Sequence, residues 1–412
     1  MRTRLGVSPN HSSFRVGVLR THLLTALFAH AFAEHTGATA QVRVRWDDTD
    51  AARTGRKHES PLLDELRHVA QIPITGAGSR QSEGTPRYRR ALARLQESGV
   101  VRGEGGAVTL DVAATDRVLR SRGQDPQTAT AQAALNTRVG LAPAEAQVRL
   151  VRSDGRALWH LASVVDDLHQ RTTLIVRGSD KINATAIQVR LFQLLGADVP
   201  PAFLFVPRLE ENDRRRSRIA ALLEAGIRPA ALRWYLVEPF LAPARGPGPH
   251  SFADLLARLR HRVPLRPDAR FDLPRLAAMD RKLSAALHTS VAREELVRAG
   301  ASADPHVLDW VATHYRRPLP HQLRLCSLLG GEPAFGAPPE EAAEAIVWLE
   351  QALGGGAETR APAPPGLAWV LTGRDEVPGL GPEVARLPSK LVAARLAAAR
   401  QALSRARAAS IR

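Results

Sequence analysis

The strand–helix–strand pattern at the start of the chain constrains its fold most strongly. Thr3–Val7 predicts a short strand, and Arg15–His35 has the apolar spacing of an amphipathic helix. Gly37 ends this helix, and the alternation in Ala40–Trp46 predicts a second strand. In such a βαβ unit, the carboxyl end of the first strand and the amino end of the helix form a crevice that receives phosphate. Gly17 lies at this turn, where a nucleotide could approach the backbone closely, although helix packing alone would also explain a glycine there.

A second α/β half is expected further along the chain. Thr172–Gly178 and Ala202–Pro207 predict buried strands, whereas Trp159–Asp167 and Ile182–Gly196 predict helices. Helices are also expected at Ser60–Val69 and Thr85–Gly99. The segment 101–150 has weak periodicity and is interpreted as an insertion or connector. Beyond Arg208 the pattern is mostly helical, interrupted by glycine- and proline-rich stretches at residues 242–251 and 353–366.

The charge balance of the chain suggests a polyanionic partner. Lysine and arginine number 57 against 41 acidic residues, which leaves a formal net charge of +16. Binding to a phosphate backbone releases counterions, so nucleic acid is the first candidate. Because almost all of these cations are arginines, GC-rich coding is an alternative cause of the excess.

Three observations exclude other classes of protein. No apolar run approaches the ~18 residues that spanning a bilayer needs, so we expect no membrane protein. Cys326 is the sole cysteine, which rules out an intrachain disulfide and fits a cytoplasmic protein. The stretch His22–Ala33 could pass for a secretory signal, but its apolar residues repeat every four positions, which favours a helix of the fold.

A series of short blocks resembles the glutamyl-tRNA synthetases, which are class I aminoacyl-tRNA synthetases. The blocks follow the order of that family across nearly the whole chain. They are TRLGVSPN (3–10), RVGVLRTHL (15–23), RWDDTD (45–50), RQSE (80–83) with Tyr88, RSDGRALWHLASVVDD (152–167), VRGSDKINAT (176–185), RRRSR (214–218), FDLPRLAAMDRKL (271–283) and LTGRDEVPGL (371–380).

This resemblance implies an α/β nucleotide-binding, Rossmann-like catalytic domain followed by mostly α-helical tRNA-binding domains. Residues 1–100 and 151–207 would form the two halves of the catalytic domain, and residues 101–150 a shortened connective insertion. Residues 208–270 would form a stem-contact region with a KMSKS-like loop, and residues 271–412 a helical anticodon-binding region. The arginine-rich helix expected at Pro388–Arg407 suits an RNA backbone, although a solvated charged helix is the alternative.

The family also implies a reaction. The carboxylate of an amino acid attacks the α-phosphate of ATP, pyrophosphate leaves, and a ribose hydroxyl of tRNA then takes the acyl group. Negative charge grows on phosphate oxygens in the first step, so catalysis depends on positioning and preorganised positive charge. The implied partners are glutamate and tRNA, and the chain is expected to be a monomer.

Both motifs that supply this charge have changed. The HIGH motif aligns with residues 15–18, where Arg15 replaces the first histidine and Gly17 is kept. The KMSKS motif aligns with residues 215–219. By this match the catalytic and ATP-binding residues are Arg15, Gly17, Arg215, Arg216, Ser217 and Arg218. Arginine can bind phosphate through two nitrogens, but its charge is less compact than that of lysine. The alternative is that these arginines are solvated or face RNA.

The resemblance assigns the amino-acid pocket in the same way. Arg4 and Arg177 would bind the side-chain carboxylate of glutamate, for which the planar guanidinium is suited. Ser8 and Ser163 would help to hold the substrate. Asp47 would receive its ammonium group, in place of the usual glutamate of the family. Trp159 replaces a tyrosine and lacks its acceptor oxygen, although taken alone it would be interpreted as a core or half-core residue.

Other residues that match the family blocks are interpreted as scaffold or as contacts to the acceptor end of tRNA. Glu83, Tyr88 and Asp180 fall in this group. Asp166 and Asp167 are neighbours on a predicted helix, where side chains point about 100 degrees apart, so they should not share one ion. Magnesium should arrive with ATP. Residues 101–150 contain neither cysteine nor histidine, so no zinc site is expected there.

Two alternatives to glutamate–tRNA ligation stay open at this point. The altered residue 15 favours a weakened, tRNA-binding relative that has lost efficient adenylation. The altered residue 159 favours an enzyme with another amino acid or another acceptor.

Overall fold

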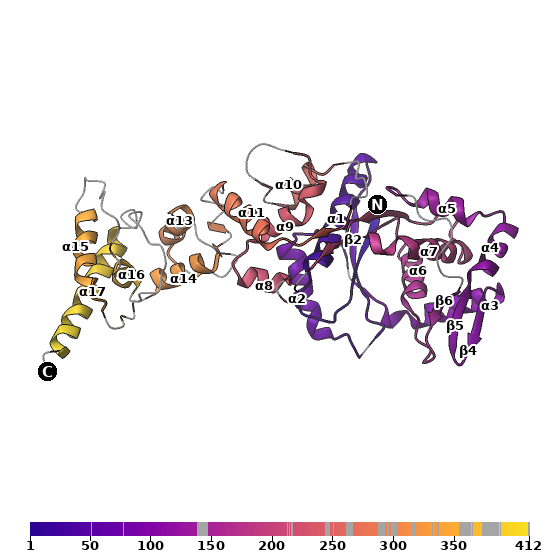
Figure 1. Cartoon of the computed structure of the whole chain (residues 1–412), viewed down its shortest axis with the longest axis horizontal. Helices are drawn as coiled ribbons and strands as arrows, with labels where there is room; N and C mark the ends of the chain where they lie inside the picture. The colour runs from indigo at the N-terminus through magenta and orange to yellow at the C-terminus, as the bar shows by residue number, and fades with distance from the viewer. Residues whose placement is uncertain are drawn as a thin grey trace. The chain divides into compact units, whose positions relative to one another are not determined.

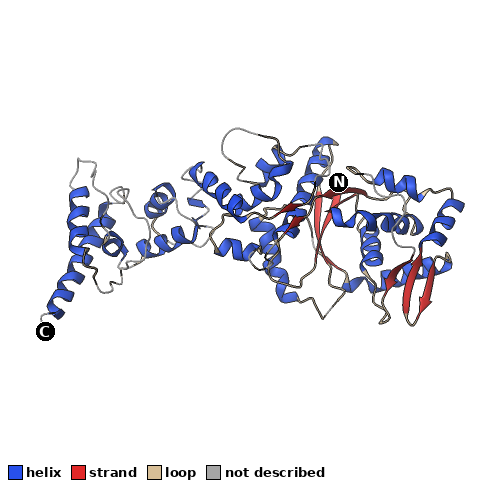
Figure 2. Cartoon of the chain, in the orientation of Figure 1, coloured by secondary structure: helices blue, strands red, loops and turns tan. Residues whose placement is uncertain are grey.

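The structure of the chain is a computed structural model. It describes residues 1–410 except 51, 77, 138–146, 212, 214, 216, 244–247, 250, 261–266, 287–292, 295, 298–300, 302, 315–318, 332, 334, 336, 337, 354–363, 365, 373–386 and 388. The described residues divide into two compact units. The first comprises Met1–Leu222 and Pro229–Leu276, and the second comprises Leu223–Arg228 and Ala277–Arg412. Among the described residues, all named strands lie in the first unit (Figure 2).

Parallel strands form the centre of the first unit (Figure 1). They are β1 (Arg2–Val7), β2 (Gln41–Trp46), β3 (Ser79–Arg80), β7 (Leu174–Gly178) and β8 (Ala202–Val206). β2 pairs with β1 and β3, and β8 pairs with β7. β1 also lies beside β7, where the backbone N–H of Thr173 donates to the carbonyl oxygen of Arg2 at 2.9 Å. The strand order is therefore β3–β2–β1–β7–β8, and the two halves of the sheet extend from β1 and β7 in opposite directions. In α/β folds, ligands bind at such a topological switch point.

The long helix α1 (Val16–His35) is a core element of this unit. It packs on β1 and β7 and on helix α9 (Pro229–Val237). By length and composition α1 is the one described helix that could cross a membrane, but 72% of its apolar stretch is buried inside the protein. Core helices of globular proteins have the same property. Gly37 has φ +64°, a conformation that favours glycine and ends the helix as the sequence predicts.

Most elements predicted in the first 207 residues are confirmed within a few residues. The remaining helices of this part are α2 (Glu59–Asp64), which continues as the π-helical turn η2 (Glu65–Val69), α3 (Thr85–Glu97), α6 (Trp159–His169) and α7 (Ile182–Leu194). The apolar faces of α3, α6 and α7 share a core with β7 and β8 that includes Leu161, Phe192 and Phe203.

The segment 101–150 is more ordered than its weak periodicity suggested. It contains β4 (Val101–Glu104), β5 (Ala107–Asp111), α4 (Val112–Ser121), α5 (Pro126–Ala133) and the start of β6 (Gln147–Val151). The three strands form an antiparallel sheet. Helices α4 and α5 pack on α7, and the fully buried Arg190 of α7 binds Asp116 of α4 at 2.7 and 3.1 Å. This segment therefore shares the core of the second α/β half.

Helices follow in the rest of the chain, as the sequence predicts, together with one short strand pair. β9 (Leu209–Glu210) pairs in parallel with β10 (Ala269–Arg270), a contact that the sequence did not indicate. The helices are α8 (Ile219–Glu224), α9, α10 (Phe252–Ala257), α11 (Leu273–Ala286), α13 (Pro305–His314), α14 (Leu319–Gly330), α15 (Ala342–Leu353), α16 (Leu367–Thr372) and α17 (Ser389–Ser410). The second unit has its own core around Trp310, Cys326 and Trp369. The division into five functional domains stays a prediction.

Candidate active site

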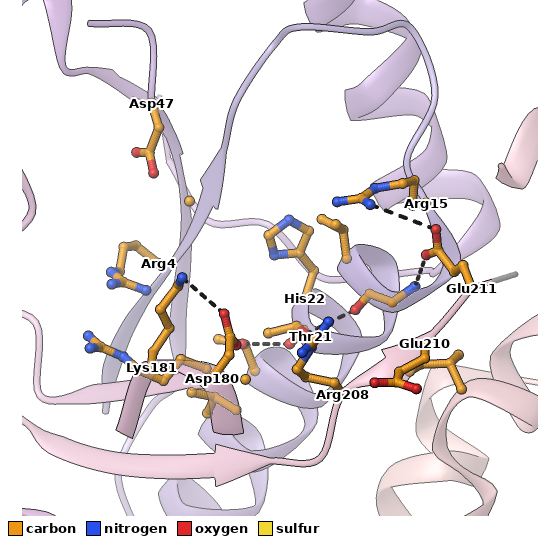
Figure 3. Close-up of a pocket in the computed structure, with 18 of the residues that line it drawn as sticks. Arg4, Arg15, Thr21, His22, Asp47, Asp180, Lys181, Arg208, Glu210 and Glu211 are labelled. Carbon is orange, nitrogen blue, oxygen red and sulfur yellow. Dashed lines mark hydrogen bonds and ion pairs between the residues drawn. The ribbon is translucent and has the colours of Figure 1, made fainter. Parts of the chain in front are cut away.

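A cavity of about 700 Å³ opens at the carboxyl ends of β1, β2 and β7, beside the amino end of α1 (Figure 3). This is the switch point of the parallel strands. Residues from both α/β halves reach it, as expected where two halves of such a fold meet. Six of the predicted site residues line it: Arg4, Arg15, Gly17, Asp47, Trp159 and Arg177.

The side chain of Arg4 reaches the cavity from β1 and is held in place by Asp167. Its Nε donates to Oδ1 of Asp167 at 2.8 Å, and its Nη2 donates to Oδ2 at 3.3 Å. Arg45 also donates to Asp167, at 3.3 Å. The Nη1 of Arg4 makes no hydrogen bond within the described residues, so it can donate to a ligand.

Arg177 lies at the end of β7 and is 6% exposed. Its Nη1 donates to the hydroxyl of Thr185 at 3.3 Å, whereas Nη2 is buried without a hydrogen-bond partner. The guanidinium lies 4.6 Å from the ring centroid of Phe203. Burial, and then repulsion from Arg4, lowers its pKa to about 9. A buried cation with no paired carboxylate among the described residues is costly, and an anion in this part of the cavity would lower that cost.

Trp159 begins α6 at the edge of the same cavity. Its side chain is partly exposed, at 36%, so it is not the core residue that burial statistics suggested. The cations of Arg177 and Lys181 lie 5.7 and 5.8 Å from its ring centroid. Lys181 also pairs with Asp180 at 2.9 Å. The indole therefore lies close to two positive charges, which its ring face attracts.

Asp47 follows β2 and lines the cavity, but an arginine already holds it. The Nε and Nη2 of Arg45 donate to its two carboxylate oxygens at 2.7 and 3.2 Å. A Cβ placed on Gly6 would come within 2.9 Å of Oδ2 of Asp47, so a side chain at position 6 would displace this carboxylate. Asp47 can still receive an ammonium group, in competition with Arg45.

The two predicted serines do not line the cavity. Ser8 is exposed after β1. Ser163 is fully buried on α6, and its Oγ has no partner among the described residues. Their roles in substrate binding stay a prediction.

The amino end of α1 carries the groups predicted to bind phosphate. Arg15 is the residue before the helix, in extended conformation. The backbone N–H of Gly17 donates to Oε1 of Glu211 at 3.2 Å, and the Ser217 hydroxyl donates to Oε2 at 3.0 Å. The Arg15 guanidinium lies 3.8 Å from the same carboxylate (Figure 3). No motif or local pattern in the sequence indicated this contact of Glu211.

The KMSKS-like loop contacts the start of α1 mainly through its backbone. The N–H of Val16 donates to the carbonyl oxygen of Ser217 at 3.0 Å. Arg218 donates to the carbonyl oxygen of Ser13 at 2.6 Å, and Arg215 is exposed; neither lines the cavity. Arg216 lies outside the described residues. Contact of these arginines with ATP therefore stays a prediction.

Further lining residues were missed by the sequence analysis. Arg208 lies two residues after β8, and the rule that ligands bind at the carboxyl ends of parallel strands could have found it. Arg270 reaches the cavity through the pairing of β9 and β10. His22 lies two helical turns after Arg15; burial, then repulsion from Arg4, lowers its pKa to about 4, so the imidazole is neutral.

The two neighbouring carboxylates on α6 contact different groups. Asp166 accepts from the hydroxyl of Tyr88 at 2.7 Å and from Gln81 at 3.1 Å. Asp167 instead binds Arg4 and Arg45, so the two carboxylates have separate partners. Glu83 forms a long ion pair with Arg80 at 3.7 Å. No cluster of three or more potential metal ligands occurs within the described residues.

Comparison with solved structures defines the class of fold. Two glutamate–tRNA ligase structures, from Elizabethkingia meningosepticum and Elizabethkingia anophelis, match with TM-scores of 0.62 and 0.60 at 15% identity. Both alignments cover 97% of this chain and 99% of the other. The chain has the fold of a class I aminoacyl-tRNA synthetase, with a Rossmann-like domain followed by helical domains.

Comparison with curated sequences then identifies the family. Proteins named glutamate–tRNA ligase 2 from Gluconacetobacter diazotrophicus and Methylorubrum populi are each 31% identical, over 74% of this chain and 75% of their own length. A glutamyl-Q tRNA(Asp) synthetase from Rhodobacter capsulatus is 30% identical over 43% of this chain and 78% of its own. A search against protein-family models found no match. The chain belongs to the glutamate–tRNA ligase family and is thus an aminoacyl-tRNA ligase.

Proposed function

We propose that the chain ligates glutamate to a tRNA at the expense of ATP, through a glutamyl-adenylate intermediate. The observation that carries this proposal is the pair Arg4 and Arg177, which face one cavity with donor nitrogens that no described carboxylate takes up. Two guanidinium groups suit the side-chain carboxylate of glutamate. The family relationship supports the same substrate.

Glutamate binds across the cavity in this proposal. Its side-chain carboxylate accepts from Nη1 of Arg4 and Nη2 of Arg177, and its ammonium group lies at Asp47. Trp159 covers the side chain from the α6 edge. Ser8 and Ser163 would join the site only if the backbone around them moved, since neither lines the cavity.

ATP binds on the α1 side of the same cavity. Its phosphates approach the N–H of Gly17 and the cations Arg15 and Arg208, and Mg²⁺ arrives with the nucleotide. Lysine and arginine side chains outnumber carboxylates among the lining residues, which fits a polyanion: Arg4, Arg15, Arg45, Arg177, Lys181, Arg208 and Arg270 against Asp47, Asp180, Glu210 and Glu211. The predicted loop residues Arg215, Arg216, Ser217 and Arg218 would reach the phosphates by a movement of their loop.

Two steps follow from this placement. An oxygen of the glutamate α-carboxylate attacks the α-phosphorus, the bond to the bridging oxygen breaks, and pyrophosphate leaves. A ribose hydroxyl of the tRNA then attacks the activated carbonyl carbon, and AMP leaves with the bonding electrons. The fixed cations lower the barrier by balancing charge that grows on phosphate oxygens.

The rest of the chain is proposed to hold tRNA. The net charge of +16 and the arginine-rich helix α17 provide attraction to a phosphate backbone. We assign stem contact to residues 208–270 and anticodon contact to residues 271–412, by family resemblance. A cytoplasmic location and a monomeric state belong to the same proposal.

Two observations favour the alternative functions. Glu211 occupies the amino end of α1, which suits a relative with weakened adenylation. Trp159 and the similarity to a glutamyl-Q tRNA(Asp) synthetase suit another amino acid or acceptor.

ATP–pyrophosphate exchange, run over a panel of amino acids with and without tRNA, tests these functions. Exchange that depends on glutamate is the expected result. Exchange with a different amino acid would select the enzyme of changed specificity. No exchange, together with salt-sensitive tRNA binding, would select the weakened relative and overturn the proposal.

A further inference from the structure

The amino end of α1 already holds an anion that belongs to this chain. The carboxylate of Glu211 accepts from the Gly17 N–H at 3.2 Å and from the Ser217 hydroxyl at 3.0 Å, and it lies 3.8 Å from Arg15. All three donors are residues that the family motifs assign to ATP. The Glu211 side chain is 7% exposed, so its charge depends on these contacts rather than on water.

A phosphate and this carboxylate cannot use the Gly17 N–H together. The N–H carries a single hydrogen, and Oε1 of Glu211 already accepts it at 3.2 Å. A phosphate oxygen that accepts this hydrogen therefore replaces the carboxylate oxygen. Both anions are attracted by the same positive end of the helix dipole.

The same cavity has other polar groups that lack a ligand. The Nη2 of Arg177 and the Nε2 of His22 are buried without a partner, and both residues are less than 10% exposed and line the cavity. Buried polar atoms are seldom left unsatisfied. This observation is independent of Glu211 and indicates that the cavity binds a polar ligand.

We propose that Glu211 is an internal competitor of the ATP phosphates and sets the affinity of the cavity for ATP. The inference rests on the proposed function. When ATP binds, the Glu211 side chain leaves Gly17 and Ser217, and a phosphate group takes its place. The main-chain contacts Val16 N–H to Ser217 O and Ile219 N–H to Phe14 O need not break, since they involve no atom of Glu211. A rotation of one side chain is therefore sufficient to open the site.

Direct binding of a non-hydrolysable ATP analogue with Mg²⁺, measured by calorimetry without amino acid or tRNA, tests this inference. Glu211→Gln keeps the shape of the side chain and removes its charge. We expect it to lower the dissociation constant about tenfold, which corresponds to ~1.4 kcal/mol. Glu210→Gln is the matched control, because Glu210 is the neighbouring carboxylate and lines the same cavity, but forms no hydrogen bond or ion pair with α1 within the described residues. This control shows how much the loss of one negative charge alone changes the dissociation constant of the ATP analogue.

Two results would overturn the inference. One is unchanged or weaker binding to Glu211→Gln; the other is an equal gain in Glu210→Gln, which would reflect net charge alone. Thermal unfolding checks that each variant folds. Glu211→Asp provides a second variant: its shorter side chain cannot span Gly17 and Ser217, so we expect an intermediate gain.

The outcome separates this inference from the proposed function. If the wild-type protein exchanges pyrophosphate with glutamate while Glu211→Gln binds ATP no better, only the role of Glu211 fails. If neither protein binds the analogue nor supports exchange, the proposed function and the inference fail together.

Discussion

Replacing Arg177 with alanine removes a buried guanidinium that pairs with no carboxylate among the described residues. In the proposed complex its Nη2 donates to the side-chain carboxylate of glutamate. A hydrogen bond to a charged group contributes about 1.5–3 kcal/mol, which corresponds to a factor of ~10–100 in affinity. We therefore expect the KM for glutamate to rise by about 10- to 100-fold in ATP–pyrophosphate exchange. The KM for ATP should change less than about threefold, because its phosphates bind at the α1 side.

Two further variants make this test specific. Arg177→Lys keeps a charge but lacks the planar fork, so its KM for glutamate should lie between those of the wild type and Arg177→Ala. Arg43→Ala removes an exposed arginine of β2 that contacts only Gln41, and it should behave as the wild type.

The free energy of unfolding of Arg177→Ala shows whether a change in KM reflects substrate binding or a loss of folding. Arg177→Ala loses contact with Phe203 but also relieves the desolvation of a buried cation. The free energy of unfolding should change by less than ~2 kcal/mol, because these two effects oppose each other. Equal increases of the KM values for glutamate and ATP would refute the assignment of Arg177 to the amino acid.

Three other predictions follow from the structure. Arg15→His should change the turnover number in exchange: an increase would indicate that the HIGH motif has lost efficiency, a decrease would indicate that arginine has been adopted, and no change would contradict its catalytic placement. Burial, followed by repulsion from Arg177 and Lys181, lowers the pKa of His160 from 6.5 to about 4. The unfolded chain thus takes up a proton before the folded one, so stability falls as the pH drops from 7 to 4. Measured by urea unfolding, the His160→Gln variant should lose roughly 1–3 kcal/mol less stability than the wild type as the pH drops from 7 to 4. The same pH dependence in both proteins would contradict the burial argument. Arg190→Met removes the buried partner of Asp116 and leaves it the exposed Arg120 at 3.9 Å. The free energy of unfolding should therefore fall by about 3 kcal/mol; a wild-type value would contradict the packing of α4 on α7.

The part of the fold that the sequence predicted well is the part with strong local patterns. In β2, β7, β8, α1 and α7, three or more apolar residues recur at regular spacing or in a run, and most residues of these strands are buried. β4 was missed because only Val101 of its residues is even partly buried, so it shows no alternation. β9 and β10 are two residues each and pair across a long sequence separation, which no local pattern records.

The candidate site was predictable where a residue ends a strand or matches a family motif. Arg4, Asp47 and Arg177 fall in this group, and all three line the cavity. Glu211 was not predictable, because its contact with Gly17 joins residues 194 positions apart. The side chain of Arg218 donates to the carbonyl oxygen of Ser13. A motif match contains no information about this contact, so it could not predict where Arg218 points.

Binding of a non-hydrolysable analogue of glutamyl-adenylate tests the central claim most directly, because it needs both halves of the cavity and no turnover. Calorimetry should give tight binding to the wild-type protein, a loss of at least tenfold in Arg177→Ala, and weaker binding of the matching glutaminyl analogue. Equal affinity for the two analogues, or no binding of either, would contradict the account.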